Sequence, residues 1–94
     1  MLVERSDIQI KPGNEAAFAA AMREKGLPIL RALKGANAVH FGQGLEHPDK
    51  FTLVIEWENM DAHIAFTKLP VFQEFLALFA PHSIGGAMEH FNMD

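Results

Sequence analysis

A tryptophan and a histidine stand six residues apart in the middle of this chain, at Trp57 and His63. An indole offers a flat wall and one N–H donor, and an imidazole with a pKa of about 6.5 can accept a proton at neutral pH. Together the two groups suit the binding and deprotonation of a planar phenolic substrate. A structural interpretation stands beside this one, because a Trp at a strand end is usually core and a His in a first helical turn usually faces solvent. Spacing alone leaves both interpretations open.

The segment from residue 51 to residue 79 predicts the elements that hold this pair. Its first seven residues alternate between two faces, which is the period of a strand with one buried side. Asn59 predicts the cap of a short helix that begins near Met60, and Pro70 suits the first turn of a second helix. The apolar strand face and the apolar helix stripe comprise Phe51, Leu53, Ile55 and Trp57, and Phe72, Phe75, Leu76 and Phe79. We expect the two to pack together, with the Trp–His pair at the mouth of the crevice.

The rest of the chain predicts a strand over residues 3–10, a helix over 16–33, a strand over 36–43 and a last strand over 84–91. Asn14 predicts a cap for the first helix. Pro28 predicts a bend in that helix, because it cannot donate a hydrogen bond to the carbonyl of Glu24, and Gly26 makes the bend easier. This order of elements predicts an α+β fold, a ferredoxin-like βαββαβ sandwich with a four-stranded antiparallel sheet, formed by a single domain over residues 1–94.

One face of the predicted sheet has no helix to cover it. Val3 and Val54 lie on that face, together with Ala38 or Phe41 depending on the strand register. On the first strand, polar residues 5–7 offer no base or substrate partner. We therefore expect Arg5 and Asp7, which share a face, to form an ion pair or to meet water rather than to act in catalysis.

Composition excludes several classes of function. Eight basic and twelve acidic residues among 94 give a formal charge of −4, and no run of Lys or Arg is present. Nucleic acid and anionic membranes are therefore poor partners. The absence of cysteine excludes disulfides and thiolate chemistry, and residues 1–10 lack the pattern of a secretory signal, which predicts a cytoplasmic location.

Five histidines could supply metal ligands, at positions 40, 47, 63, 82 and 90. No two of them have the spacing of ligands on one helix, and nothing in the sequence indicates that His40 and His90 meet. Scattered histidines are the simpler interpretation, so no metal is expected. The chain also lacks a glycine-rich phosphate loop, a nucleophile elbow and a dinucleotide-binding fingerprint.

The Glu56–Trp57 pair, the His six residues after the Trp, and the F-x-x-F motif at Phe72 and Phe75 resemble the antibiotic biosynthesis monooxygenase domain family. The order of strands and helices extends this resemblance over nearly the whole chain. The resemblance implies a homodimer, in which the uncovered sheet faces meet to form a dimeric α+β barrel. The family includes cofactor-free monooxygenases that oxidise phenols or anthrones to quinones, haem-degrading members, and isomerase or stress-related proteins.

The resemblance implies catalytic roles for Trp57 and His63 in a crevice without a cofactor or a metal. The substrate-binding residues expected in this crevice are Leu53, Ile55, Phe66, Phe72 and Phe75. The hypothesis is a cofactor-free monooxygenase, an oxidoreductase, that acts on a small aromatic phenol, hydroquinone or anthrone-like compound. The alternative is a non-oxidative ligand-binding or isomerase protein of the same dimeric α+β barrel fold. In either case the expected partner is a small apolar aromatic or quinonoid molecule.

Two positions depart from the branches of this family. Leu53 stands where the quinone-forming members place an amide side chain, four residues before the Trp. Thr67 stands where the haem-degrading members place their axial His, so haem is not the expected ligand.

Overall fold

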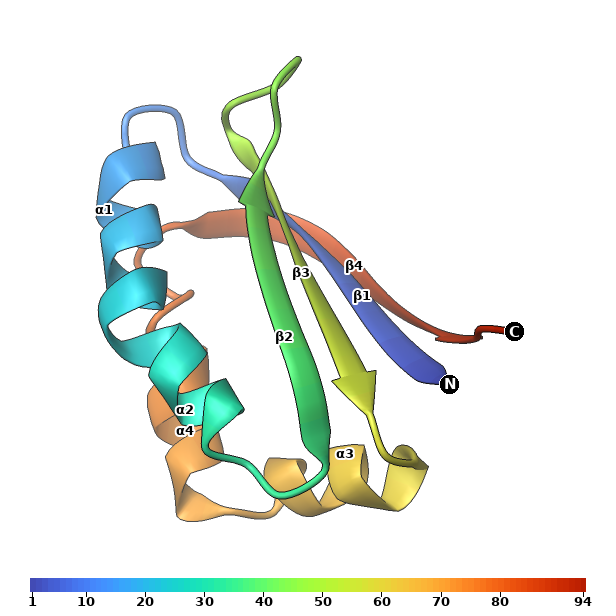
Figure 1. Ribbon diagram of the computed structural model, residues 1–94. Helices are drawn as coiled ribbons and strands as arrows, with labels where there is room; N and C mark the ends of the chain where they lie inside the picture. The colour runs from blue at the N-terminus through green and yellow to red at the C-terminus, as the bar shows by residue number, and fades with distance from the viewer.

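Four antiparallel strands form one twisted sheet in the order β2-β3-β1-β4 (Figure 1). The computed structural model describes residues 1–94. The strands are β1 (Leu2–Ile10), β2 (Ala36–Gln43), β3 (Lys50–Trp57) and β4 (Ser83–Asn92). β1 pairs with β3 on one side, where Val3 is opposite Glu56, and with β4 on the other, where Val3 is opposite Phe91. This topology confirms the predicted ferredoxin-like α+β fold.

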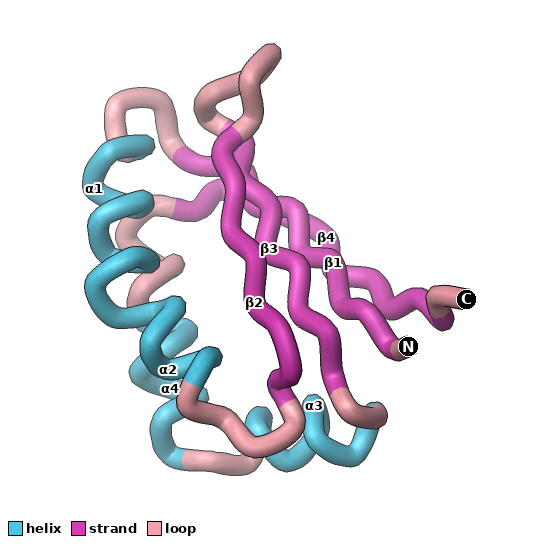
Figure 2. Tube along the Cα trace, viewed as in Figure 1, coloured by secondary structure: helices cyan, strands magenta, loops and turns pink.

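The helices lie on one side of the sheet and leave its other side open (Figure 2). They are α1 (Glu15–Ala21), the π-helical segment η1 (Met22–Gly26), α2 (Leu27–Arg31), α3 (Met60–Thr67) and α4 (Pro70–Ala77). The first three follow one another without a break and run along the sheet, whereas α3 and α4 are separated by a short turn. None of these helices combines the length and the apolar character that crossing a bilayer requires.

The first helix is irregular just before Pro28. The N–H of Leu27 donates to the carbonyl of Met22, five residues back, which is the pattern of a π turn. This wider turn precedes Pro28, which has no N–H to continue the α-helical pattern. A Cβ at Gly26 would lie 2.7 Å from the Sδ of Met22, so the buried Met22 side chain would have to shift to accommodate a larger residue. A π segment thus interrupts the α-helical pattern just before Pro28, in a helix that continues to Arg31, and the bend predicted at Pro28 stays a prediction.

The apolar face of β3 packs against the helices as its alternation predicts. Phe51, Leu53, Ile55 and Trp57 are each at most 2% exposed. From the first helix, the completely buried side chains are Phe18, Met22 and Leu30. The alternate residues of β3 and the buried residues of the first helix thus form the two sides of one hydrophobic core.

Only one of the two predicted helix caps is formed by its side chain. The Oδ1 of Asn59 accepts a hydrogen bond from the N–H of Ala62 at 2.9 Å, which confirms the cap of α3. Asn14 is at the predicted N-cap position of α1, where its carbonyl accepts from the N–H of Phe18 at 2.9 Å, but its side chain makes no capping bond. Its Nδ2 instead lies 3.0 Å from the Nδ1 of His82 and so links the start of α1 to the loop before β4.

The open face of the sheet is mixed in character. The register puts Ala38 opposite Glu56 on this face, whereas Phe41 is opposite Leu53 and packs on the helix side. Arg5 and Asp7 form the expected ion pair, with 3.0 Å between Nη2 and Oδ2, and both side chains remain at least half exposed.

Candidate functional site

A cavity of about 260 Å³ lies between α3, α4 and the helix side of the sheet. Ten of its fourteen lining residues are hydrophobic. The lining includes all seven residues that the sequence singles out for the crevice: Leu53, Ile55, Trp57, His63, Phe66, Phe72 and Phe75. The structure therefore brings the predicted residues together around one cavity, and these residues come from three different elements.

Regular periodicity explains how each element contributes to the cavity. β3 directs alternate side chains to the helix side, so Leu53, Ile55 and Trp57 form a continuous wall. The cap at Asn59 starts α3, and His63 and Phe66 then follow three residues apart on the face that meets this wall.

Edge-to-face aromatic contacts build the apolar walls. The ring of Phe66 lies 5.0 Å from that of Phe72 and 5.6 Å from that of Phe75, measured between centroids. The indole of Trp57 meets the imidazole of His63 at 5.3 Å, with an angle of 71° between the planes. These separations are typical of stable aromatic pairs, so the walls are ordered surfaces against which a flat ligand can pack.

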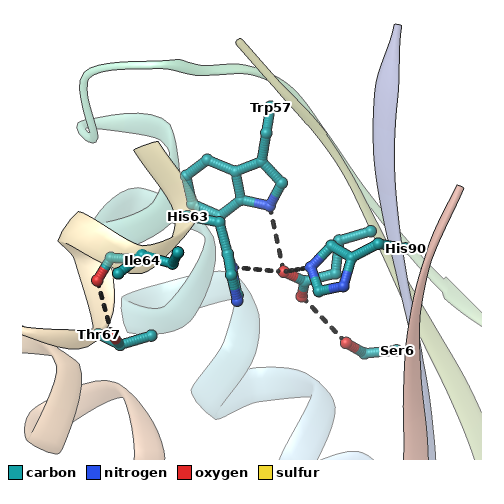
Figure 3. Close-up of polar contacts among 7 residues, drawn as sticks. Ser6, Trp57, His63, Ile64, Thr67 and His90 are labelled. Carbon is teal, nitrogen blue, oxygen red and sulfur yellow. Dashed lines mark hydrogen bonds and ion pairs between the residues drawn. The ribbon is translucent and has the colours of Figure 1, made fainter. Parts of the chain in front are cut away.

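One end of the cavity is polar, and its centre is a buried carboxylate. Glu4 is 5% exposed. Its Oε1 accepts a hydrogen bond from the indole N–H of Trp57, and its Oε2 accepts one from the hydroxyl of Ser6, each at 3.1 Å (Figure 3). Both donors are needed because a buried carboxylate without hydrogen bonds is strongly destabilising.

Two imidazoles complete this polar corner, which comprises Glu4, Ser6, Trp57, His63 and His90. The Nδ1 of His63 lies 3.0 Å from the Oε1 of Glu4, and the Nε2 of His90 lies 3.6 Å from the same atom. The two imidazole rings meet at 4.7 Å between centroids (Figure 3). Both of these nitrogens are buried and have no hydrogen-bond partner. The 3.0 Å approach is therefore an electrostatic contact without the alignment of a hydrogen bond.

The environment of His63 differs from that of a surface histidine. Its side chain is only 13% exposed, so the interpretation that a first-turn His faces solvent is wrong here. Burial lowers the pKa of His63 below its ordinary value of 6.5, the carboxylate of Glu4 acts in the opposite direction, and His90 lowers it further. Burial thus favours the neutral imidazole, which is the form that can accept a proton.

The sequence analysis missed Glu4, Ser6 and His90. A signal for the first two was present, because they occupy positions on the same face of β1 as the buried Ile8 and Ile10. His90 carried no such signal, since it enters the site only through the register that sets it opposite Glu4. The interpretation of five scattered histidines is consequently wrong for His63 and His90, which lie side by side.

Thr67 stands where the resemblance places the axial His of haem-degrading members. Thr67 lines the cavity, and its hydroxyl donates to the carbonyl of Ile64 at 2.6 Å (Figure 3). This hydroxyl is therefore held by its own helix.

Comparisons with known proteins assign the chain and its fold to one family. The model of the antibiotic biosynthesis monooxygenase family matches residues 1–78. The chain belongs to this family. The match includes the strands and helices that form the cavity, but ends before β4, which supplies His90.

Individual proteins and solved structures are similar to this chain along most of its length. The uncharacterised protein YczJ of Bacillus subtilis strain 168 is 32% identical over 79 residues, which cover 83% of this chain and 82% of YczJ. A candidate antibiotic biosynthesis monooxygenase from Bordetella bronchiseptica is 27% identical, with a TM-score of 0.89 over 99% of this chain and 96% of the other. A similarly named protein from Deinococcus radiodurans has a TM-score of 0.87 over 100% and 93% of the two chains, and its 13% identity supports the fold alone. Membership of this family supports a monooxygenase-like role.

Proposed function

We propose that the chain is a monooxygenase that acts on a small, flat and mostly apolar phenol, hydroquinone or anthrone-like compound bound in the cavity. The observation that carries the proposal is the combination of aromatic walls with a single polar corner at one end. A cavity of about 260 Å³ is slightly smaller than the range of about 300 to 1,000 Å³ typical of drug-sized ligands, so the substrate is small.

The apolar walls and the polar corner together orient the substrate. A planar ring packs against Phe66, Phe72 and Phe75, where it replaces water on apolar surface. Its hydroxyl or acidic C–H group then points to the polar corner, which holds the polar side chains of the lining apart from Thr67. Trp57 serves as a wall, because its N–H is already engaged by Glu4.

His63 accepts the substrate proton in this proposal. Its Nδ1 faces the carboxylate of Glu4, which leaves Nε2 for the substrate and stabilises the imidazolium as it forms. The resulting substrate anion reacts with O₂. For the CH₂ group of an anthrone, one oxygen atom of O₂ becomes the new carbonyl oxygen, and the other leaves as water with the two hydrogens.

We also propose that the open sheet face forms a homodimer, as in the α+β barrel of the family. Val3, Val54 and Ala38 are partly exposed on this face, and Phe91 is 40% exposed. Burial of these side chains against a second copy would stabilise the pair. Light scattering at micromolar concentration should give twice the chain mass, and Val54→Asp should shift it to the monomer, because the variant would bury an unpaired charge. A monomer mass for the unmodified protein would contradict the barrel.

Oxygen uptake tests the function. Purified protein should consume O₂ with either substrate, releasing water and the quinone from an anthrone, or water and a quinone with one added oxygen atom from a hydroquinone. His63→Ala should lower turnover about 10²-fold, the usual scale for loss of a general base, with little change in substrate affinity. Trp57→Ala should instead weaken substrate binding by a few kcal/mol through the loss of aromatic contact.

A second histidine provides a matched control. His47 is exposed in the loop between β2 and β3, so His47→Ala should leave both turnover and affinity unchanged. Tight binding of these aromatics without O₂ consumption would support the non-oxidative alternative, a ligand-binding or isomerase protein. If His63→Ala retains full activity, His63 is not the base.

A further inference from the structure

Glu4, His63 and His90 bring three metal-ligating side chains to one point from β1, α3 and β4. One ligand atom from each lies within 4.8 Å of the other two. The two measured separations from the Oε1 of Glu4 are 3.0 Å to the Nδ1 of His63 and 3.6 Å to the Nε2 of His90. Two imidazoles and one carboxylate are a ligand set of zinc enzymes and of non-haem iron sites.

The spacing of these atoms fits a transition-metal ion. Two ligand atoms that are each about 2.1 Å from an ion, at angles of 90° to 110°, lie about 3.0 to 3.4 Å apart. The two separations from Glu4 are close to this range. The third, between the imidazoles, is at most 4.8 Å, so a shift on the order of 1 Å in one ring would bring all three atoms onto one ion.

The hydrogen bonding of the corner also fits such a site. The two nitrogens that face Glu4 are buried and have no hydrogen-bond partner, which is uncommon for polar atoms inside a protein. The carboxylate, by contrast, is held by Trp57 and Ser6. Ligating carboxylates normally have such outer partners, which fix their orientation.

The surroundings leave room for a ligand from the cavity side. Glu4 and His63 line the apolar cavity, so an ion between the three side chains would face it. Catalytic metal sites keep one position open in this way, whereas structural sites use four protein ligands. Nitrogen donors favour zinc and its neighbours in the first transition row over Mg²⁺ and Ca²⁺, which prefer oxygen.

We propose that Glu4, His63 and His90 bind one divalent first-row transition-metal ion, such as Zn²⁺ or Co²⁺, at the polar end of the cavity. The site goes beyond the proposed function, which uses no metal. An ion on the Nδ1 of His63 leaves the proton of that ring on Nε2, so metal binding and proton acceptance exclude each other at this residue.

Calorimetric titration of the full chain, first stripped with a chelator, tests the site. Zn²⁺ should bind with a stoichiometry of one ion per chain, and Co²⁺ should give the visible absorption of a protein-ligated ion. Glu4→Gln keeps the shape of the side chain and an oxygen acceptor for the Trp57 N–H, but removes the charge. We expect Glu4→Gln and His90→Ala each to weaken Zn²⁺ affinity by about 10²-fold or more.

His40→Ala is the matched control, because His40 also lies near a glutamate, with 3.9 Å between its Nε2 and the Oε2 of Glu56, but on the exposed face. Unchanged affinity in this variant supports the buried site. The proposal is overturned if the unmodified chain binds no ion, if His90→Ala retains full affinity, or if His40→Ala loses as much as His90→Ala. Should Glu4→Gln fail to fold, as judged by circular dichroism, the two histidine variants decide.

The titration contains no organic substrate, so its failure would leave the proposed oxidation standing. Oxygen uptake measured with a chelator present examines that oxidation separately. Activity that persists in the chelator together with stoichiometric Zn²⁺ binding would support both proposals.

Discussion

Two aromatic clusters on the helix side of the sheet contain similar residues but differ in how fully they fill their volume. The Phe18 cluster comprises Phe18, Phe41 and Phe51, and its rings lie 5.1 to 6.1 Å apart between centroids. The cavity cluster, which comprises Trp57, His63, Phe66, Phe72 and Phe75, surrounds an open space with a polar end. The first fills its volume with side chains, whereas the second does not.

The covering elements account for the difference. The Phe18 cluster lies under the long first helix, which continues through η1 and α2 to Arg31. The cavity cluster lies under α3 and α4, which have eight residues each and meet at a turn. β4 adds little bulk beside them, since it carries Gly85 and Gly86, and the Met88 side chain at the cavity is 54% exposed. A binding site thus forms where short elements leave volume unfilled, next to a region that is densely packed.

The largest expected effect on stability belongs to the packed cluster. Phe18 is completely buried, so Phe18→Ala should lower the free energy of unfolding by about 3 to 5 kcal/mol. Chemical denaturation, with the urea midpoint compared at constant slope, measures this effect. The fraction that remains folded should bind aromatic ligands as the unmodified protein does, because Phe18 does not line the cavity.

Phe72→Ala reverses this pattern and makes the comparison sharper. Phe72 is partly exposed and lines the cavity, so we expect a loss of about 1 to 2 kcal/mol in stability together with weaker ligand binding. Equal effects of the two substitutions on both properties would show that the clusters are not functionally distinct.

The next largest effect concerns the hydrogen bond between Trp57 and Glu4. Trp57→Phe keeps an aromatic ring in the wall but removes the N–H that reaches Oε1 at 3.1 Å. A buried carboxylate that loses a donor should lower the free energy of unfolding by about 1 to 3 kcal/mol. Thermal unfolding of Trp57→Phe measures this loss of stability. An unchanged unfolding temperature would mean that water or a histidine replaces the lost donor.

Much of the cavity was predictable because periodicity fixes which residues share a face. Alternation assigned Leu53, Ile55 and Trp57 to one wall before any tertiary contact was known, and the i, i+3 spacing did the same for Phe72 and Phe75. The order of elements likewise determined the fold, since few topologies satisfy the connection rules.

The polar corner was not predictable in the same way. Glu4 occupies a core-facing position of β1, where the alternating pattern predicts an apolar residue. Apart from Ser6, its partners lie on elements distant in sequence. His63 and His90 meet because α3 crosses the end of the sheet where β4 pairs with β1. Such contacts depend on strand register and helix placement, which local periodicity does not specify.

A smaller effect is expected for the second donor of the corner. Ser6→Ala removes the hydroxyl that donates to the Oε2 of Glu4 at 3.1 Å, and should lower stability by about 0.5 to 1.5 kcal/mol. Thr52→Ala offers a control on the open face, where the lost hydroxyl contacts the exposed carboxylate of Asp7. Denaturation should rank Ser6→Ala above Thr52→Ala, because burial strengthens the interaction; the reverse order would contradict this account of the corner.

The smallest effect belongs to the exposed ion pair of the open face, the solvent-facing counterpart of the corner. The hydrogen bond from Arg5 lowers the pKa of Asp7 below its ordinary value of 3.8, with burial acting against it and the Thr52 hydroxyl adding to it. A carboxyl group with a lowered folded-state pKa stabilises the fold above its unfolded pKa, and this contribution is lost as the pH falls through the folded pKa. Below pH 4 the protein should therefore lose a small increment of stability that salt reduces, because both side chains are at least half exposed. NMR titration of the Asp7 carboxyl measures the midpoint directly, and Arg5→Gln should move it upward while leaving the Thr52 contribution in place. An unchanged midpoint of Asp7 in Arg5→Gln would show that solvent already screens this ion pair. The exposed pair would then contribute far less to the fold than the buried hydrogen bonds of Glu4.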